Sequence, residues 1–151
     1  ATQTALIAFA HLVDGATTKV PFVAHEGCHE IGGVHTCDRR RDLAELRKDF
    51  PMVDYDSAEL QESDPFWSPE VREPLAQLAD RCHKLLLWLR GRPEREVAVV
   101  AHFGWLFTLM NAALECEDPK LRLGFLTGEL RSVRLRFEDV DAPAAKRARA
   151  A

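Results

Sequence analysis

The feature that most constrains the fold is a run of five small or β-branched residues, VAVVA, at positions 97–101. A continuous apolar run of this length is typical of a strand buried on both faces, which occurs mainly in parallel sheets covered by helices. Apolar helices are predicted before it, over residues 74–90, and after it, over residues 104–114. Strands alternating with helices predict an α/β fold, a three-layer sandwich with a largely parallel central sheet and helices on both faces.

Shorter elements are predicted around this core. The helix over residues 74–90 is the clearest, because apolar residues recur along it at i, i+3, i+4 and i+7. The other predicted elements are helices over 2–13 and 39–48, the latter with Asp38 as N-cap, strands over 19–24 and 130–137, irregular segments over 25–38 and 52–69, and a disordered tail over 141–151.

Composition excludes several classes of protein. The 151 residues suit one domain, and 46% hydrophobic with 29% charged residues is an ordinary globular balance. The longest nearly charge-free stretch, 103–114, is shorter than the ~20 residues of a membrane span. No secretory signal is visible, so we expect a cytoplasmic protein with reduced cysteines. A net charge of −4 gives no general attraction to nucleic acid, and the oligomeric state is left open.

A histidine stands at the carboxyl end of the predicted strand. His102 is followed by Phe103 and Gly104, where the next helix begins. Ligands of open α/β sheets bind beyond the carboxyl ends of the strands, and a helix N-terminus offers free N–H groups to an anion. The sequence therefore predicts an anion site at His102, Phe103 and Gly104, although a histidine that only caps the helix fits the pattern equally well.

The segment 25–38 is the second candidate site. It contains Cys28, His29, His35 and Cys37, which are possible zinc ligands, but the adjacent Cys28 and His29 depart from the usual ligand spacing. We therefore expect no metal. Glu26 and Glu30 in the same segment are candidate general acids. The arginines at 39–41 are typical of a solvated helix face, or they help to gather an anionic substrate.

These segments, in their order along the chain, resemble motifs of the histidine phosphatase superfamily, the phosphoglycerate mutase-like proteins. VVAHFG at 99–104 is similar to the family's second-histidine motif. EGCHEIGGVHTCDRRR at 26–41 resembles the segment of eukaryotic mutase-like phosphatases that carries an acidic residue, then Gly-Val-His-x-Cys-Asp and basic residues. Further matches are Phe50-Pro51, Trp67, Val71-Arg72-Glu73, Arg81 and the GELRS stretch at 128–132, where Thr127 stands in place of the usual Asn.

The resemblance implies a phosphate-monoester hydrolase that acts on a small phosphorylated substrate through a phosphohistidine intermediate, without a cofactor. It assigns His102 as the second imidazole of the phosphate pocket and Glu30 as the proton donor, with Glu26 as second choice. His102, Phe103 and Gly104 would bind the phosphate, and His102 and Glu30 would face one cleft at the carboxyl end of the sheet. Two alternatives stay open, a phosphoglycerate mutase and a non-catalytic phosphate-binding or scaffold protein.

The chain also departs from the family pattern. The nucleophilic motif, Arg-His-Gly, does not occur in the 151 residues. TQTA at 2–5 resembles the helix that follows the family's second phosphate-binding arginine, which would fall just before Ala1. We therefore expect an N-terminally truncated fragment with a partial domain over 1–140 and almost no turnover by itself. A degenerate pseudoenzyme is the alternative explanation.

Overall fold

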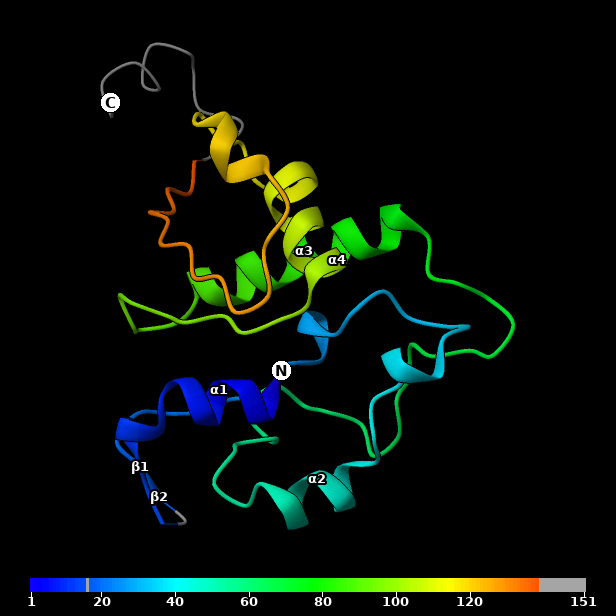
Figure 1. Cartoon of the computed structure of the whole chain (residues 1–151), viewed down its shortest axis with the longest axis vertical. Coiled ribbons are helices and arrows are strands. Elements are labelled where there is room, and N and C mark those ends of the chain that lie inside the picture. The colour runs from blue at the N-terminus through cyan, green and yellow to red at the C-terminus, as the bar shows by residue number, and fades with distance from the viewer. Residues whose placement is uncertain (16, 139–151) are drawn as a thin grey trace.

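The computed structural model describes residues 1–15 and 17–138, so the tail predicted to be disordered, 141–151, lies outside the described residues (Figure 1). Within that part of the chain the α-helices are α1 (Thr2–Ala8), α2 (Leu43–Asp49), α3 (Leu75–Arg90) and α4 (Phe103–Thr108). The strands β1 (Val13–Asp14) and β2 (Thr17–Thr18) form an antiparallel hairpin in which Val13 pairs with Thr18. Single turns of 3-10 helix span Ala10–Leu12, Glu26–Cys28, Thr36–Asp38 and Pro119–Arg122, and α4 continues as a π-helical turn, Leu109–Ala113.

The helices predicted over 74–90 and 104–114 are confirmed within one residue at their starts. Pro74 precedes α3, where the missing N–H of proline costs no helical hydrogen bond. Gly91 follows α3, and glycine is common at the end of a helix. The apolar stripe of α3 packs against α4. The buried members of this α3–α4 cluster are Leu78, Cys82, Leu85 and Trp105.

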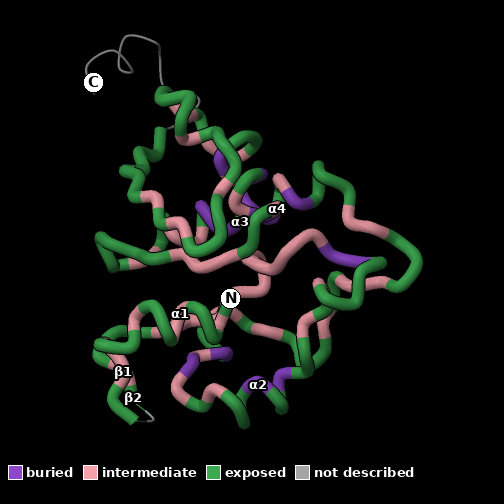
Figure 2. Tube along the Cα trace, viewed as in Figure 1, coloured by how far each residue is buried: buried purple, intermediate pink, exposed green. Residues whose placement is uncertain are grey.

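A second apolar cluster surrounds α2. Figure 2 shows buried segments in both regions and a further buried stretch on the chain that connects them. The partly buried Leu6 of α1 packs against this α2 cluster. The chain between residues 25 and 42 connects the two regions. The buried members of the α2 cluster are Leu43, Leu46, Val53 and Tyr55.

The predicted strands do not form in the described residues. Residues 97–101 and 130–137 pair with no other described segment, and Val97 and Leu130 are 50% and 84% exposed. In place of a strand over 19–24 there is one isolated parallel bridge, between Val23 and Asp54. A strand persists only where a neighbour accepts and donates its backbone hydrogen bonds. The hairpin β1–β2 is the one sheet in the described residues, so the three-layer sandwich is not seen there.

Two helix boundaries differ from the prediction. The helix predicted over 2–13 ends at Ala8, and Gly15, with φ +59°, turns the following chain into the hairpin. The helix predicted over 39–48 begins only at Leu43, so Asp38 is not its N-cap. The Asp38 carboxylate accepts a hydrogen bond from Arg72 instead, at 2.7 Å, because an arginine offers it a stronger partner than a backbone N–H.

Candidate functional site

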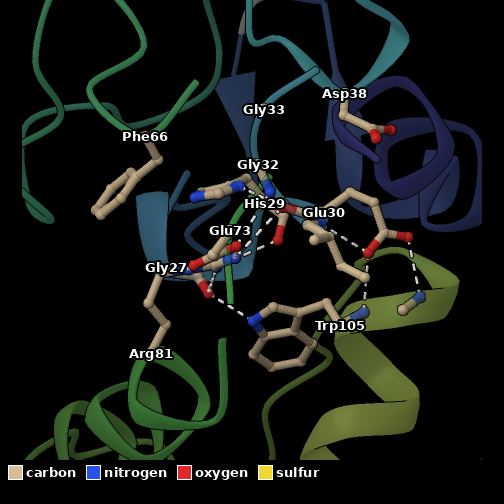
Figure 3. A network of polar contacts seen from close by, with 12 residues as sticks. Gly27, His29, Glu30, Gly32, Gly33, Asp38, Phe66, Glu73, Arg81 and Trp105 are labelled. Carbon is tan, nitrogen blue, oxygen red and sulfur yellow. Dashed lines mark hydrogen bonds and ion pairs between the residues drawn. The ribbon is translucent and has the colours of Figure 1, made fainter. Parts of the chain in front are cut away.

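Glu30 lies at the first turn of α4 (Figure 3). Its carboxylate accepts hydrogen bonds from the backbone N–H groups of Gly104 at 2.9 Å and Trp105 at 3.0 Å, and from its own neighbour Ile31 at 2.9 Å. The first N–H groups of a helix have no partner within the helix, so the carboxylate caps α4. The fold thus brings Glu30 to the two residues that follow Phe103, although more than seventy positions separate them in the sequence.

His102 immediately precedes α4 and is exposed as a residue. Partial burial of its imidazole lowers the pKa of His102 below the usual 6.5, and the amino group of Ala1 acts in the same direction. The carboxylates of Glu30 and Asp38 oppose this shift without cancelling it. The ring is therefore mainly neutral at pH 7, with one N–H to donate and one lone pair to accept.

Gly104 leaves room for the Glu30 carboxylate. A Cβ atom at residue 104 would lie 2.5 Å from Glu30 Oε1, closer than real Cβ contacts. The Gly104 N–H, predicted from sequence to bind phosphate, is already donated to Glu30. A phosphate oxygen and the Glu30 carboxylate would therefore compete for the same donor.

Glu26, the second-choice acid, lies in a different environment. Arg40 Nε donates to both of its carboxylate oxygens, at 2.9 and 3.1 Å, and both side chains are largely buried. Glu26 is thus an ion-pair partner of Arg40, while Glu30 faces α4. The geometry favours Glu30 over Glu26 as the acid beside residues 102–104.

The loop that carries Glu30 is attached to α3 by a buried ion pair. Arg81 of α3 donates to both oxygens of Glu73, each at 2.7 Å, and to backbone carbonyls of the loop. Burial alone would raise the pKa of Glu73, but hydrogen bonds from Arg81 and from the Gly32 N–H lower it overall. From the sequence, Arg81 is only a match to the family pattern. Its signal is its place three residues after Leu78 on the apolar stripe, where a charge must be paired.

Gly33 is a further residue whose role sequence analysis missed. Its φ is +85°, and a Cβ atom would lie 1.9 Å from the Val71 carbonyl oxygen. Its own carbonyl accepts a hydrogen bond from Arg72, which also binds Asp38. The signal in the sequence is the Gly-Gly pair at 32–33, which begins two residues after the candidate acid.

The four possible zinc ligands do not form a common site. Cys28 and His29 are partly buried, whereas His35 and Cys37 are exposed. Burial raises the pKa of the Cys28 thiol to about 12 and lowers that of His29. Among residues 1–15 and 17–138, no three His, Cys, Asp or Glu side chains are grouped so that they could hold a metal ion.

The three arginines at 39–41 have different partners. Arg40 pairs with Glu26, Arg41 donates to Asp49 at 2.6 Å, and Arg39 lies over the Trp67 ring at 5.2 Å. They line a surface hollow of about 380 Å³ together with Thr36, Asp42 and Glu45. A second hollow, of about 370 Å³, lies against α3 around Phe66 and Arg81. Neither His102 nor Glu30 lines these two hollows, so a cleft shared by His102 and Glu30 stays a prediction.

Comparison with known proteins identifies the class. The model of the histidine phosphatase superfamily (branch 1) matches residues 2–142, and the chain belongs to this family, whose fold is α/β. No solved structure gives a significant match. No helix within the described part of the chain has the length and apolarity needed to cross a membrane.

The similar curated proteins carry mutase names. The chain is 42% identical over 117 residues to phosphoglycerate mutase-like protein 1 of Arabidopsis thaliana, an alignment that covers 75% of this chain and 41% of that protein. It is 38% identical over 143 residues to phosphoglycerate mutase-like protein 2 of the same plant, covering 76% and 41%. A probable phosphoglycerate mutase of Arthroderma benhamiae is 31% identical over 127 residues, covering 82% and 36%. The chain thus spans about two fifths of the length of these relatives.

Proposed function

We propose that this chain carries the proton-donor part of a phosphoryl-transfer site, in a phosphate-monoester hydrolase that works through a phosphohistidine. The observation that supports this most directly is the contact between Glu30 and the first turn of α4, next to His102. An acid and a neutral imidazole at one place suit a reaction in which an alkoxide must leave and a phosphoryl charge must be stabilised. Membership of the histidine phosphatase superfamily supports the same reaction class.

Each group has a distinct part in the proposed reaction. A nucleophilic histidine, which no Arg-His-Gly motif supplies within these 151 residues, attacks phosphorus and breaks the ester P–O bond. Glu30, in its protonated form, gives its proton to the leaving oxygen. Protonation of Glu30 releases the Gly104 N–H, which then holds the phosphoryl oxygens together with His102 and the Phe103 N–H. Water then attacks the phosphohistidine while Glu30 takes up the water proton, which releases inorganic phosphate and restores the histidine.

The same proposal covers the intact protein. Residues 1–140 would form part of a three-layer α/β domain, in which 97–101 gains strand neighbours and lies within a parallel sheet. The substrate would be a small phosphate ester, with no metal, cofactor, nucleic acid or membrane involved, in a cytoplasmic setting. Residues 1–151 by themselves would turn over almost no substrate.

Two other functions have specific support. A non-catalytic phosphate-binding role fits the absence of Arg-His-Gly from the sequence. A phosphoglycerate mutase fits the name of the Arthroderma benhamiae relative. A mutase returns the phosphoryl group to an organic acceptor, whereas a hydrolase passes it to water, so the products separate these two.

Phosphate binding by the 151-residue chain provides the test. We expect orthovanadate to shift the backbone amide signals of His102, Phe103 and Gly104 in nuclear magnetic resonance spectra. His102→Ala should weaken binding roughly tenfold, the effect of one hydrogen bond to a charged group. His83→Ala, on the exposed side of α3, is the matched control and should bind as the parent does.

Two results would contradict the proposal. One is vanadate binding that His102→Ala leaves unchanged. The other is hydrolysis of an aryl phosphate by the 151-residue chain that disappears in His102→Ala, since it would mean that a nucleophile is present within these residues.

A further inference from the structure

The Arg81 guanidinium uses all five of its N–H donors (Figure 3). Nε and Nη2 donate to the two carboxylate oxygens of Glu73, each at 2.7 Å. The other three bonds go to backbone carbonyls of one short loop, to Gly27 at 2.8 Å, His29 at 3.2 Å and Glu30 at 3.3 Å. The side chains of Arg81 and Glu73 are 7% and 5% exposed.

Glu73 attaches the other end of the same loop. Its Oε2 accepts the Gly32 N–H at 3.0 Å, so one ion pair binds the backbone on both sides of Glu30. The indole N–H of Trp105 donates to the Gly27 carbonyl, which ties α4 to the loop as well. The backbone position of Glu30 is therefore determined by α3 from one side and by α4 from the other.

We propose that Arg81 is a positioning residue, which with Glu73 holds the backbone of residues 27–32 so that the Glu30 carboxylate meets the first turn of α4. The functional meaning of this position rests on the proposed role of Glu30 as the acid. Arg81 acts through Glu30 and makes no contact with the reacting groups.

If the ion pair of Arg81 and Glu73 only stabilised the fold, replacing both residues would leave the position of Glu30 unchanged. Replacing both members of a buried pair by apolar residues of similar size is often neutral for stability, whereas removing one member leaves a buried charge unpaired. The double variant Arg81→Met/Glu73→Leu should therefore stay folded, while the three loop carbonyls lose their bonds to Arg81 and the Gly32 N–H loses its bond to Glu73. The fold and the position of Glu30 can thus be tested apart.

Hydrogen exchange in the 151-residue chain provides the measurement, and it needs no bound ligand. In the double variant we expect the amides of Gly104 and Trp105 to exchange about tenfold faster relative to the central amides of α3. The pKa of His102 should fall further, because the Glu30 carboxylate raises it in the parent chain. Arg81→Lys, which keeps the charge but not the planar fork, should shift both readouts in the same direction by less.

Arg92→Lys is the matched control. Arg92 also binds both oxygens of a glutamate, Glu94, at 2.9 and 2.7 Å, but this pair is partly exposed and does not touch the loop. Arg92→Lys should leave the Gly104 and Trp105 amides unchanged. If the double variant does not fold, Arg81→Lys measured against Arg92→Lys decides the question.

The proposal is overturned if the Gly104 and Trp105 amides exchange at the parent's rate in folded Arg81 variants. That result would leave vanadate binding at His102 untouched. Conversely, a chain that binds no vanadate but shows the exchange effect would contradict the proposed function and retain Arg81 as the residue that places Glu30.

Discussion

At the scale of single residues, two glycines allow the loop around Glu30 to pack closely. Gly33 adopts a φ of +85° against the Val71 carbonyl, and Gly104 leaves space for a carboxylate oxygen. A side chain does not fit at either position. The local sequence does not reveal why, because both constraints come from segments that are distant along the chain. These two glycines therefore allow the loop and the first turn of α4 to pack closely around Glu30.

Gly33→Ala should be strongly destabilising. The positive φ alone costs about 1–3 kcal/mol, and a Cβ atom 1.9 Å from the Val71 carbonyl oxygen forces residues 68–71 to move as well. Gly128→Ala is the control, because φ is +75° there but no atom lies within 4 Å of the added Cβ. Urea unfolding followed by circular dichroism should show a larger loss for Gly33→Ala. Equal losses would mean that the contact with Val71 yields without cost.

Glu30→Ala should also destabilise the chain, by about 1–3 kcal/mol, because three backbone N–H groups lose their acceptor. Glu30→Gln should cost less, since its amide oxygen still accepts one or two of these bonds. The measurement is urea unfolding of the parent and the two variants at pH 7. A Glu30→Ala chain as stable as the parent would show that water replaces the carboxylate at α4 without penalty.

At the scale of elements, α3 is the helix against which the rest of the site is placed. One of its faces supplies Leu78, Cys82 and Leu85 to the α3–α4 cluster, and Arg81 on the same side reaches the loop. The opposite side is exposed. Burial and exposure therefore alternate along α3 with the helical period, as the sequence pattern predicted, although Leu75, the first residue of the predicted apolar stripe, is exposed.

Leu78→Ala and Leu75→Ala should differ sharply although both lie on α3. Leu78 is fully buried, so its truncation should cost about 2–5 kcal/mol through lost burial and the cavity left beside Trp105. Leu75 is 66% exposed, and its truncation should change stability by less than about 0.5 kcal/mol. Thermal unfolding of both variants provides the comparison. A similar effect at the two positions would contradict the burial seen for α3.

The elements also show what the sequence could predict. Periodicity and capping residues predicted α3 and α4 within one residue at their starts, since both depend on local pattern. The strand over 97–101 was predicted from its β-branched composition, but its pairing depends on a neighbouring strand, which the described residues do not provide. At the site, residue type selected Glu30 and His102 as candidates. The choice between Glu30 and Glu26 depends on their hydrogen-bond partners, which only the structure shows. Glu26 binds Arg40, whereas Glu30 binds the first turn of α4.

At the scale of the whole molecule, residues 25–42 join the two apolar clusters. Cys28 and Ile31 pack against the α3–α4 cluster, and Leu43 of the α2 cluster follows directly in sequence. Ion pairs hold this connection, Glu26 with Arg40 and Asp38 with Arg72. A change of charge in this segment should therefore affect the stability of the whole molecule.

Acid should destabilise the folded chain, because three of its histidines have lowered pKa values. Burial lowers the pKa of His25, His29 and His102 below 6.5, so the unfolded chain binds protons at these histidines more readily than the folded chain does. The stability that their neutral forms provide is fully present above pH 6.5 and is lost as the pH falls below it. Glu73, whose pKa is lowered overall, should add a second loss of stability below about pH 4.5, as its carboxylate takes up a proton and its ion pair with Arg81 is broken.

Urea unfolding between pH 8 and pH 4 at constant ionic strength should therefore show a free energy of unfolding that is higher at pH 8 than at pH 5.5. His29→Phe should reduce this slope, because it removes one titrating ring and keeps an aromatic side chain against Phe66, whose ring centroid lies 4.9 Å from that of His29. The sign follows from proton binding alone, since unfolding takes up protons at each histidine with a lowered pKa. A free energy of unfolding that stays level or rises on acidification from pH 8 to pH 5.5 would contradict the lowered pKa values of these histidines.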